Sequence, residues 1–300
     1  MNPVYPLISI VTPSYNQGQY LEKTIHSVLD QDYPNLEYII IDGGSTDHSV
    51  ATIKKYEKFL KYWVSEPDHG QSHAINKGFR HATGELLSWL NSDDYYMPGA
   101  LHKVAEIAAA NPQASVFVGA GRIVDSSGKV SHYKEPRAEI GIESLYNWMN
   151  GQHFMQPSCL FRRDAWENAG PLDEQLYIAF DLDLWLRMAK KGCKFMSIQE
   201  LLSTALSHDS AKTTVFEHWM TVDVAIVIMR HGGEGPVRYH LENIARRLSM
   251  YEPNFEKIIN HPLYKVLGPI IKLLFKPAVR WRDTLPRWSS DKREDLSIKK

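Results

Sequence analysis

The chain has 300 residues, of which 43% are hydrophobic and 23% charged, and its formal net charge is -1. These values fit a soluble globular protein of one or two domains and exclude an electrostatic argument for binding nucleic acid. With two cysteines, Cys159 and Cys193, no secretory signal in residues 1–6 and no apolar run of membrane-spanning length, we expect a cytoplasmic protein without a disulfide framework.

The first half of the chain alternates predicted strands with predicted helices. Strands are expected at residues 7–12, 37–42, 62–65 and 86–90, and helices at 20–31, 47–59 and 72–82. The β-branched run in 37–42 is typical of a strand that is buried on both faces. This order of elements predicts a parallel, doubly wound α/β core.

The second half mixes hairpin and helix signals. Strands are expected at residues 115–118, 121–125, 129–133, 158–162, 195–198 and 201–206. Helices are expected at residues 100–110, 142–149, 164–169 and 181–191, and from 215 onward. The polar, charged residues 289–300 are predicted to be a disordered tail.

Asp93 and Asp94 directly follow the buried strand at 86–90, at the edge where open α/β sheets place ligands. Two carboxylates buried together raise each other's pKa, and a Mg²⁺ or Mn²⁺ ion would remove that cost. The alternative is that the pair caps the helix that begins near residue 98.

The other predicted strand ends also carry polar loops, at residues 12–16, 42–47 and 66–68. Tyr15 can stack on a nucleic base, and Asp42 and Asp68 can accept hydrogen bonds from a base N–H or from ribose hydroxyls. The alternatives are a packed turn aromatic for Tyr15, and turn formation or helix capping for Asp42 and Asp47.

A series of short motifs matches one known family in both order and spacing. They lie at residues 8–16, 41–47, 65–70, 74–78, 82–85, 90–94, 170–174 and 181–187. On these motifs, residues 5–210 resemble the inverting family 2 glycosyltransferases. The resemblance implies the GT-A fold, which is the α/β fold of nucleotide-diphospho-sugar transferases with a mostly parallel central sheet, here followed by a helical C-terminal extension.

The resemblance also implies a site for a nucleotide-sugar donor, most often a UDP-linked one. The residues expected to bind it are Thr12, Pro13, Ser14, Tyr15, Asn16, Asp42, Asp68, Asn76, Asn91 and Asp93. Asp94 and Asp93, with His208, would bind Mn²⁺ or Mg²⁺ on the diphosphate, although Asp93 can instead reach the donor's ribose or sugar. A lone histidine such as His208 is also often structural.

Asp181 stands where the family has its general base. Such a base takes the proton of the acceptor hydroxyl while the oxygen attacks the anomeric carbon from the opposite face, and this single displacement inverts the configuration. The alternative for Asp181 is an acid stabilised by the dipole at the start of a helix.

Four positions depart from the family pattern. Gly43 replaces a base-contacting acid, Ile75 an arginine on the diphosphate side, and Phe180 a glutamate before the base. His73 stands where a related subgroup has aspartate. These departures leave the fold prediction intact and blur the choice of donor.

Residues 261–288 form an aromatic-rich segment with six basic residues and one acid, or +5 formally. Such a segment is typical of a membrane-surface element and equally of helices that pack on a catalytic core. One hypothesis is that it docks at the inner face of the cell membrane, where it meets a lipid-linked glycan acceptor. The predicted domains are a catalytic domain at 1–212, with a nucleotide-sugar half (1–97) and an acceptor half (98–212), and a helical extension at 213–288.

The predicted function is metal-dependent, inverting transfer of a sugar to a saccharide or lipid-linked glycan, in surface polysaccharide synthesis and without a nucleic-acid partner. A sugar-nucleotide nucleotidyltransferase is disfavoured because residues 13–16 replace its glycine-rich basic loop. A dinucleotide-binding oxidoreductase is disfavoured because Gly119 and Gly121 lack the third glycine of that fingerprint. A non-catalytic glycan-binding relative is disfavoured by the presence of Asp94 and Asp181.

Overall fold

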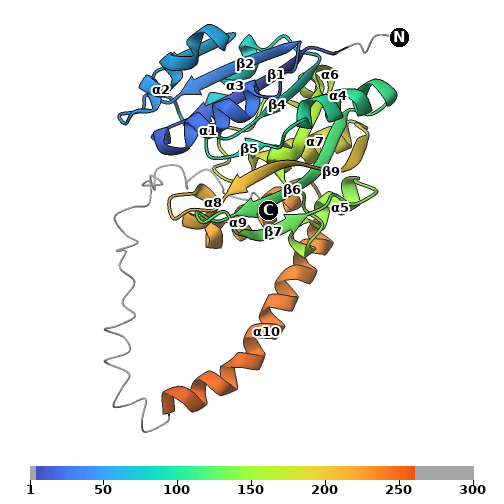
Figure 1. Ribbon diagram of the computed structural model, residues 1–300. Coiled ribbons are helices and arrows are strands. Elements are labelled where there is room, and N and C mark those ends of the chain that lie inside the picture. The colour runs from blue at the N-terminus through green and yellow to red at the C-terminus, as the bar shows by residue number, and fades with distance from the viewer. Residues whose placement is uncertain (1–4, 261–300) are drawn as a thin grey trace, which may run out of the picture. The chain divides into compact units, whose positions relative to one another are not determined.

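The computed structural model describes residues 5–260, apart from the side chains of residues 217–218, 248 and 250–260. Within these residues the centre of the fold is a nine-stranded sheet in the order β3-β2-β1-β4-β8-β6-β9-β5, with β7 paired to β6 (Figure 1). The strands are β1 (Ile8–Ser14), β2 (Leu36–Asp42), β3 (Tyr62–Ser65), β4 (Leu86–Trp89), β5 (Tyr95–Tyr96), β6 (Val116–Val124), β7 (Val130–Lys134), β8 (Cys159–Arg162) and β9 (Phe195–Leu206).

Most strands of the sheet run in one direction. β1 pairs in parallel with β2 and β4, and β2 pairs in parallel with β3. β8 is antiparallel to both β4 and β6, so β6 and its parallel neighbour β9 run in the same direction as β1. The predicted, mostly parallel sheet is therefore confirmed, and β5, β7 and β8 are its reversed strands.

Helices cover both faces of the sheet. The α-helices of the described residues are α1 (Gly18–Leu29), α2 (Ser49–Tyr56), α3 (Gln71–His81), α4 (Ala100–Ala110), α5 (Ile142–Tyr146), α6 (Arg163–Ala169), α7 (Phe180–Lys190), α8 (Lys212–Val215), α9 (Glu217–Arg230) and α10 (Glu234–Asn260). Side chains alternate between the faces: Ile10 and Ile40 pack with α1, α2 and α4, whereas Val11 and Ile39 pack with α3, α6 and α7. The β-branched strands are thus buried on both sides, as their sequence predicts.

The hydrophobic core between the sheet and helices α3, α6 and α7 contains the two largest fully buried side chains, Trp89 of β4 and Trp185 of α7. Their rings are stacked, with centroids 5.8 Å apart and planes inclined by 10°. This contact joins the strand that leads into Asp93 and Asp94 to the helix that carries Asp181.

Two pairs of predicted strands are in fact single strands. Residues 115–118 and 121–125 belong to the continuous β6, and residues 195–198 and 201–206 belong to the continuous β9. The two strands pair in parallel, and their register shifts between Val118 and Ala120 and again between Ala120 and Gly121. The residues that looked like breaks are irregularities within one ladder, so the prediction of separate strands was wrong.

Residues up to His240 form one compact unit, and a second unit begins at Leu241. The first unit contains the sheet and all helices from α1 to α9. None of the helices within residues 5–260 combines the length and the apolar content needed to cross a membrane. The predicted basic segment 261–288 and the tail 289–300 lie outside the described residues.

Candidate active site

The parallel strands β1, β2 and β3 end at the same level of the sheet. Ser14, the last residue of β1, lies opposite Asp42, the last residue of β2, and Asp42 lies opposite Ser65 of β3. The loops that follow these strands therefore meet at one edge, as the topology requires.

The loops after β1 and β2 are joined by Asn16, which has a left-handed backbone with φ of 51°. Its backbone N–H donates to Ser45 Oγ at 2.8 Å, and its side-chain Oδ1 accepts from the Thr46 N–H at 2.8 Å. Tyr15, between this residue and the strand, is 62% exposed. The predicted stacking residue is thus held on a fixed loop with its ring open to a ligand.

The residues before Tyr15 are buried at the end of β1. Thr12 lies in the core, where its hydroxyl shares a 3.1 Å hydrogen bond with the Tyr38 hydroxyl. Pro13 is also buried. Ser14 is 4% exposed, and its Oγ has no hydrogen-bond partner among the described residues. Buried hydroxyls normally have a partner, so Ser14 is the member of this run best placed to donate to a bound molecule.

Asp42 is fully buried, and its carboxylate organises the loop that follows β2. Oδ2 accepts hydrogen bonds from the backbone N–H groups of Gly44 (3.2 Å) and Ser45 (2.8 Å) and from Ser65 Oγ (2.6 Å), while Oδ1 accepts from Ser45 Oγ (2.6 Å). The structure therefore gives Asp42 the turn-forming role that the sequence left as the alternative. Its contact with a nucleoside stays a prediction.

Asp68 occupies the space that a side chain at position 43 would need. A Cβ built on Gly43 would lie 2.8 Å from Asp68 Oδ2. The other carboxylate oxygen, Oδ1, accepts a hydrogen bond from the Gly70 N–H at 2.8 Å. A side chain at position 43, where the family pattern has an acid, would therefore meet the Asp68 carboxylate.

Asp94 is 6% exposed at the end of β4. Its Oδ2 accepts a hydrogen bond from the Asn91 side-chain amide at 3.0 Å. Burial, and then the neighbouring Asp93 carboxylate, raise the pKa of the Asp94 carboxyl well above its usual value. The backbone of this loop is fixed by Thr24 of α1, whose hydroxyl contacts the carbonyl oxygens of Ser92 (2.9 Å) and Asp94 (2.7 Å).

Asp93 is paired with His208, which follows β9. Asp93 Oδ2 lies 3.1 Å from His208 Nε2, and the other ring nitrogen lies 2.9 Å from Ser210 Oγ. The imidazole also packs on the Tyr20 ring, with centroids 4.3 Å apart. The structure thus brings His208 to the aspartate pair, as predicted, through Asp93.

The predicted metal ligands Asp93, Asp94 and His208 point their ligand atoms in different directions. Asp93 and His208 contact each other, whereas Asp94 contacts Asn91. Among the residues that the structure describes, three such side chains do converge elsewhere: the ligand atoms of His69, His73 and Glu174 lie within 4.8 Å of one another. That set is largely exposed and contains two imidazoles, so its chemistry differs from the oxygen-rich sets that Mg²⁺ and Mn²⁺ prefer.

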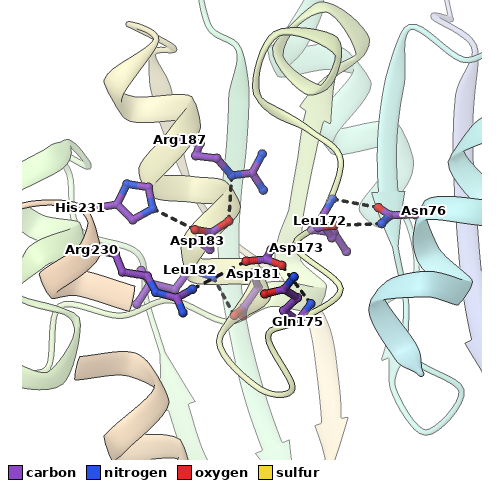
Figure 2. A network of polar contacts seen from close by, with 10 residues as sticks. All are labelled: Asn76, Leu172, Asp173, Gln175, Asp181, Leu182, Asp183, Arg187, Arg230 and His231. Atoms are coloured by element: carbon purple, nitrogen blue, oxygen red, sulfur yellow. Dashed lines mark hydrogen bonds and ion pairs between the residues drawn. The ribbon is translucent and has the colours of Figure 1, made fainter. Parts of the chain in front are cut away.

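Asn76 of α3 holds the chain segment that precedes α7 (Figure 2). Its Oδ1 accepts from the Leu172 N–H at 2.8 Å, and its Nδ2 donates to the Leu172 carbonyl at 3.0 Å and to Glu174 Oε1 at 2.9 Å. Both ends of the amide are therefore engaged within the protein. Its predicted contact with the donor remains a prediction, and its observed role is to join α3 to the segment that precedes α7.

Asp181 lies in the first turn of α7 and is partly exposed. Its Oδ1 accepts a hydrogen bond from the Leu182 N–H at 2.7 Å. Burial raises the pKa of Asp181 to about 6, against the lowering effect of that hydrogen bond and of the Lys212 ammonium. A carboxyl group with such a pKa is suited to act as a general base near neutral pH.

The next acid on α7 has a different environment, as Figure 2 shows. Asp183 Oδ2 accepts from Arg187 Nε at 2.8 Å, and Asp183 Oδ1 lies 2.9 Å from His231 Nε2. Asp183 is therefore a structural acid that fastens α7 to the end of α9. Of the two, Asp181 is the one that lacks such partners.

Two residues of this site were not predicted from the sequence. Lys212, at the start of α8, donates from Nζ to Gln71 Oε1 at 3.1 Å. Gln71, at the start of α3, donates from Nε2 to Asn91 Oδ1 at 2.6 Å. Gln71 lies just after the motif at 65–70, so its place beside the site could have been inferred, whereas no spacing or motif marks Lys212.

Comparison with known proteins identifies what this arrangement resembles. The profile of the family "Glycosyl transferase family 2" matches residues 9–169. A putative teichuronic acid biosynthesis glycosyltransferase, TuaG of Bacillus subtilis, is 30% identical over 203 residues, which are 66% of this chain and 78% of that protein. An uncharacterised glycosyltransferase of Rickettsia typhi is 28% identical over 221 residues, 71% of this chain and 67% of that protein.

Solved structures of similar fold include glycosyltransferases with bound donors. Residues 1–349 of S. aureus TarS in complex with UDP match with a TM-score of 0.56 and 17% identity, covering 90% of this chain and 77% of that one. The mannosyltransferase PcManGT of Pyrobaculum calidifontis, with GDP-Man and Mn²⁺, matches with a TM-score of 0.57 and 15% identity, covering 91% and 88%. The longer TarS chain is covered to 43%. These likenesses show the shared GT-A-type fold.

Proposed function

The chain belongs to glycosyl transferase family 2, and we propose that it transfers a sugar, with inversion, from a nucleotide-diphosphate sugar to a hydroxyl group of a saccharide or lipid-linked glycan. The observation that carries this proposal is Asp181, a carboxyl group with a pKa of about 6 on the helix that packs, through Trp185, against Trp89 of the strand leading to the Asp93–Asp94 pair. The relationship to TuaG, a putative teichuronic acid biosynthesis enzyme, supports a role in surface polysaccharide synthesis.

The donor would lie over the ends of β1, β2 and β4. Tyr15 would stack on the base, Ser14 Oγ would donate to the nucleotide, and Asp68 would accept from the base or ribose. UDP and GDP-Man occur in the structural relatives, and UDP is the first donor nucleotide to test.

The residues at the end of β4 suit a divalent cation. Asp94 and Asp93 supply hard oxygen atoms, and the burial and the repulsion from Asp93 that raise the pKa of Asp94 are costs that a cation removes. Asp94 and Asp93 would hold Mn²⁺ or Mg²⁺, with His208 beside them. When bound, the ion would neutralise the negative charge on the departing diphosphate.

The chain's own residues would then complete a single displacement. The acceptor oxygen forms a bond to the anomeric carbon as the bond from that carbon to the diphosphate breaks. Asp181 accepts the proton of the acceptor hydroxyl, and the nucleoside diphosphate leaves with the electron pair of the broken bond. Because the attack comes from the face opposite the leaving group, the configuration inverts.

The test combines a screen of donors with one isosteric variant. Thermal-shift measurements with UDP-, GDP- and dTDP-sugars and Mn²⁺ would select the donor, and transfer or hydrolysis would then be measured with it. Asp181→Asn should lower the rate about 10²- to 10⁴-fold while UDP binding, measured by calorimetry, is kept.

The control for that variant is Asp164→Asn. Asp164 lies in the first turn of α6 and accepts a hydrogen bond from the next residue's N–H at 2.7 Å, as Asp181 does, but it is exposed. Its replacement should leave the rate unchanged. Unchanged turnover in Asp181→Asn would refute the base assignment, and absence of transfer by the unaltered protein with every donor would favour the non-catalytic alternative.

A further inference from the structure

Lys212 is held at the point where several parts of the candidate site meet. Its Nζ donates to Gln71 Oε1 at the start of α3. The same ammonium group lies 4.0 Å from the ring centroid of Tyr177 and 5.4 Å from that of Phe180, the residue before Asp181. A hydrogen bond and two aromatic faces therefore fix the position of this cation next to the start of α7.

From Lys212 a chain of hydrogen bonds runs to Asp94. The ammonium donates to Gln71 Oε1 (3.1 Å), Gln71 Nε2 donates to Asn91 Oδ1 (2.6 Å), and Asn91 Nδ2 donates to Asp94 Oδ2 (3.0 Å). An ammonium can only donate, so the Lys212 end dictates which way both amides face. Each link polarises the next in the same sense.

The charges that face Lys212 are acidic and come from two helices. They are Asp181 of α7 and Asp223 of α9, and Tyr177 is the titratable group of the connecting segment. Cys159 of β8 faces Asp181 from the sheet side, and Arg230 faces Asp223. The ammonium of Lys212 lowers the pKa of both carboxyl groups, whose burial raises it.

We propose that Lys212 is a positioning residue of the transfer reaction: it holds the Asp181 carboxylate in its ionised form and, through Gln71 and Asn91, fixes Asp94 relative to that base. This inference rests on the proposed role of Asp181. The proposed role of Lys212 assigns a function to the short helix α8, which lies outside both the donor motifs and the motif of the base.

The charges of Asp181 and Lys212 make the rate of transfer depend on pH. The base must be ionised, and its pKa is about 6, while burial lowers the pKa of Lys212 to about 8 against the opposing effect of Asp181 and Asp223. The two groups are charged at the same time only between these values. The rate should therefore rise through about pH 6, as Asp181 ionises, and fall through about pH 8, because neutral Lys212 no longer dictates which way the Gln71 and Asn91 amides face.

Three variants and one control test the proposal on the full chain with UDP-sugar and Mn²⁺, with kcat/KM measured from pH 5 to 9. In Lys212→Met the acidic limb should move up by about one pH unit, because an opposite charge beside a carboxyl shifts its pKa by about that amount or more. In Lys212→Arg the acidic limb should stay and the alkaline limb should vanish, because guanidinium does not titrate in this range.

Gln71→Leu interrupts the hydrogen-bonded chain and keeps the ammonium. It should lower kcat while leaving the acidic limb in place, which separates the positioning of Asp94 from the charge effect on Asp181. The control is Lys103→Met on α4, which removes a lysine paired with Glu106 and Glu200 and should change neither limb. Superposition of the Lys212→Met profile on that of the unaltered protein would overturn the inference.

A second measurement needs no turnover. NMR of protein labelled with ¹³C at the aspartate carboxyl carbons gives the pKa of Asp181 directly, with Asp181→Asn to assign its signal. That pKa should rise in Lys212→Met and stay in Lys212→Arg. If no donor is turned over, the proposed function fails while this titration still decides the inference; an unchanged Asp181 pKa in Lys212→Met rejects it.

Discussion

Glu37, at the amino end of the parallel strands, and Asp94 and Asp181, at the carboxyl end, are carboxyl groups with pKa values shifted in opposite directions. At the amino end, Glu37 of β2 accepts hydrogen bonds from Ser9 Oγ (2.6 Å), from the Thr83 N–H (2.7 Å) and from Thr83 Oγ1 (2.5 Å). Burial alone would raise its pKa, but these bonds and the Lys61 ammonium outweigh it and lower the pKa of Glu37 to about 2. At the carboxyl end, burial raises the pKa of both Asp94 and Asp181.

The difference distinguishes the amino end of the sheet, which stabilises the fold, from the carboxyl end, which carries the candidate active site. The amino end surrounds its carboxylate with donors, so ionisation favours folding. At the carboxyl end, Asp94 and Asp181 keep a raised pKa despite the hydrogen bonds from Asn91 and Leu182, so these two acids are suited to bind a cation or a proton. Functional sites with such incompletely paired groups commonly leave the protein less stable than it could be.

Removing the base is the strongest way to break this comparison. Beyond its effect on the rate, Asp181→Asn should raise the free energy of unfolding at pH 7 by about 2 kcal/mol, allowing for solvent screening of this partly exposed group. The folded-state pKa of about 6 exceeds the usual 3.8, so ionised Asp181 opposes folding. That opposition is absent at low pH and grows until the pH passes about 6.

Urea unfolding at pH 5 and pH 7 measures this effect. The gain from Asp181→Asn should be larger at pH 7, and Asp164→Asn should show no such pH-dependent gain. A variant that is less stable than the unaltered protein at pH 7 would mean that Asp181 is a structural acid.

The amino end should respond in the opposite sense. Glu37→Gln should lower the free energy of unfolding by about 2 kcal/mol, because hydrogen bonds to a charged acceptor are lost, and should leave kcat unchanged. The folded-state pKa lies below the usual 4.5, so this stabilisation is fully present above that value and is lost as the pH falls towards 2.

Denaturant titration at pH 7 checks the effect of Glu37→Gln, with Glu85→Gln as the matched control. Glu85 lies at the same end of the sheet but is exposed, and its replacement should leave stability unchanged. A loss of activity without a loss of stability in Glu37→Gln would remove the distinction between the two ends.

Tyr15 gives the smallest effect and sharpens the comparison at the carboxyl end. Tyr15→Ala should weaken UDP binding about 10-fold, since stacking on a base contributes ~1–3 kcal/mol, and should leave the free energy of unfolding unchanged. Tyr133→Ala, at a tyrosine of β7 that is 50% exposed, is the control and should change neither quantity. Calorimetric titration with UDP decides between binding and packing roles for Tyr15.

Local sequence patterns were sufficient for the donor half of the fold. The runs around Ile10 and Ile40 are β-branched, end in polar loops and alternate with amphipathic helices, so strands, direction and ligand edge all followed from them. β6 and β9 were not predicted as continuous strands, because each is completed by pairing with the other across about 80 residues of chain. Such long-range pairing leaves no periodic signal in the sequence.

The sequence predicted which residues form the candidate site better than it predicted the contacts between them. The motifs placed Asp93, Asp94 and His208 together, but they did not reveal that His208 pairs with Asp93. For Asp42 the sequence left turn formation as an alternative to ligand binding and could not decide between them, because hydrogen bonding to neighbouring backbone depends on conformation. Lys212 was missed because its importance lies in what surrounds it.

The parallel indole pair of Trp89 and Trp185 makes the packing of this site optically readable. Two stacked indoles couple their electronic transitions, which produces a paired signal in circular dichroism that separated tryptophans lack. Trp89 stands two residues before Asn91, and Trp185 follows Asp181 by about one helical turn. The circular dichroism signal therefore reports whether β4, which leads to the aspartate pair, is packed against α7, which carries Asp181. The rate at which the signal is lost on unfolding measures how fast these two elements separate, without a label or a substrate.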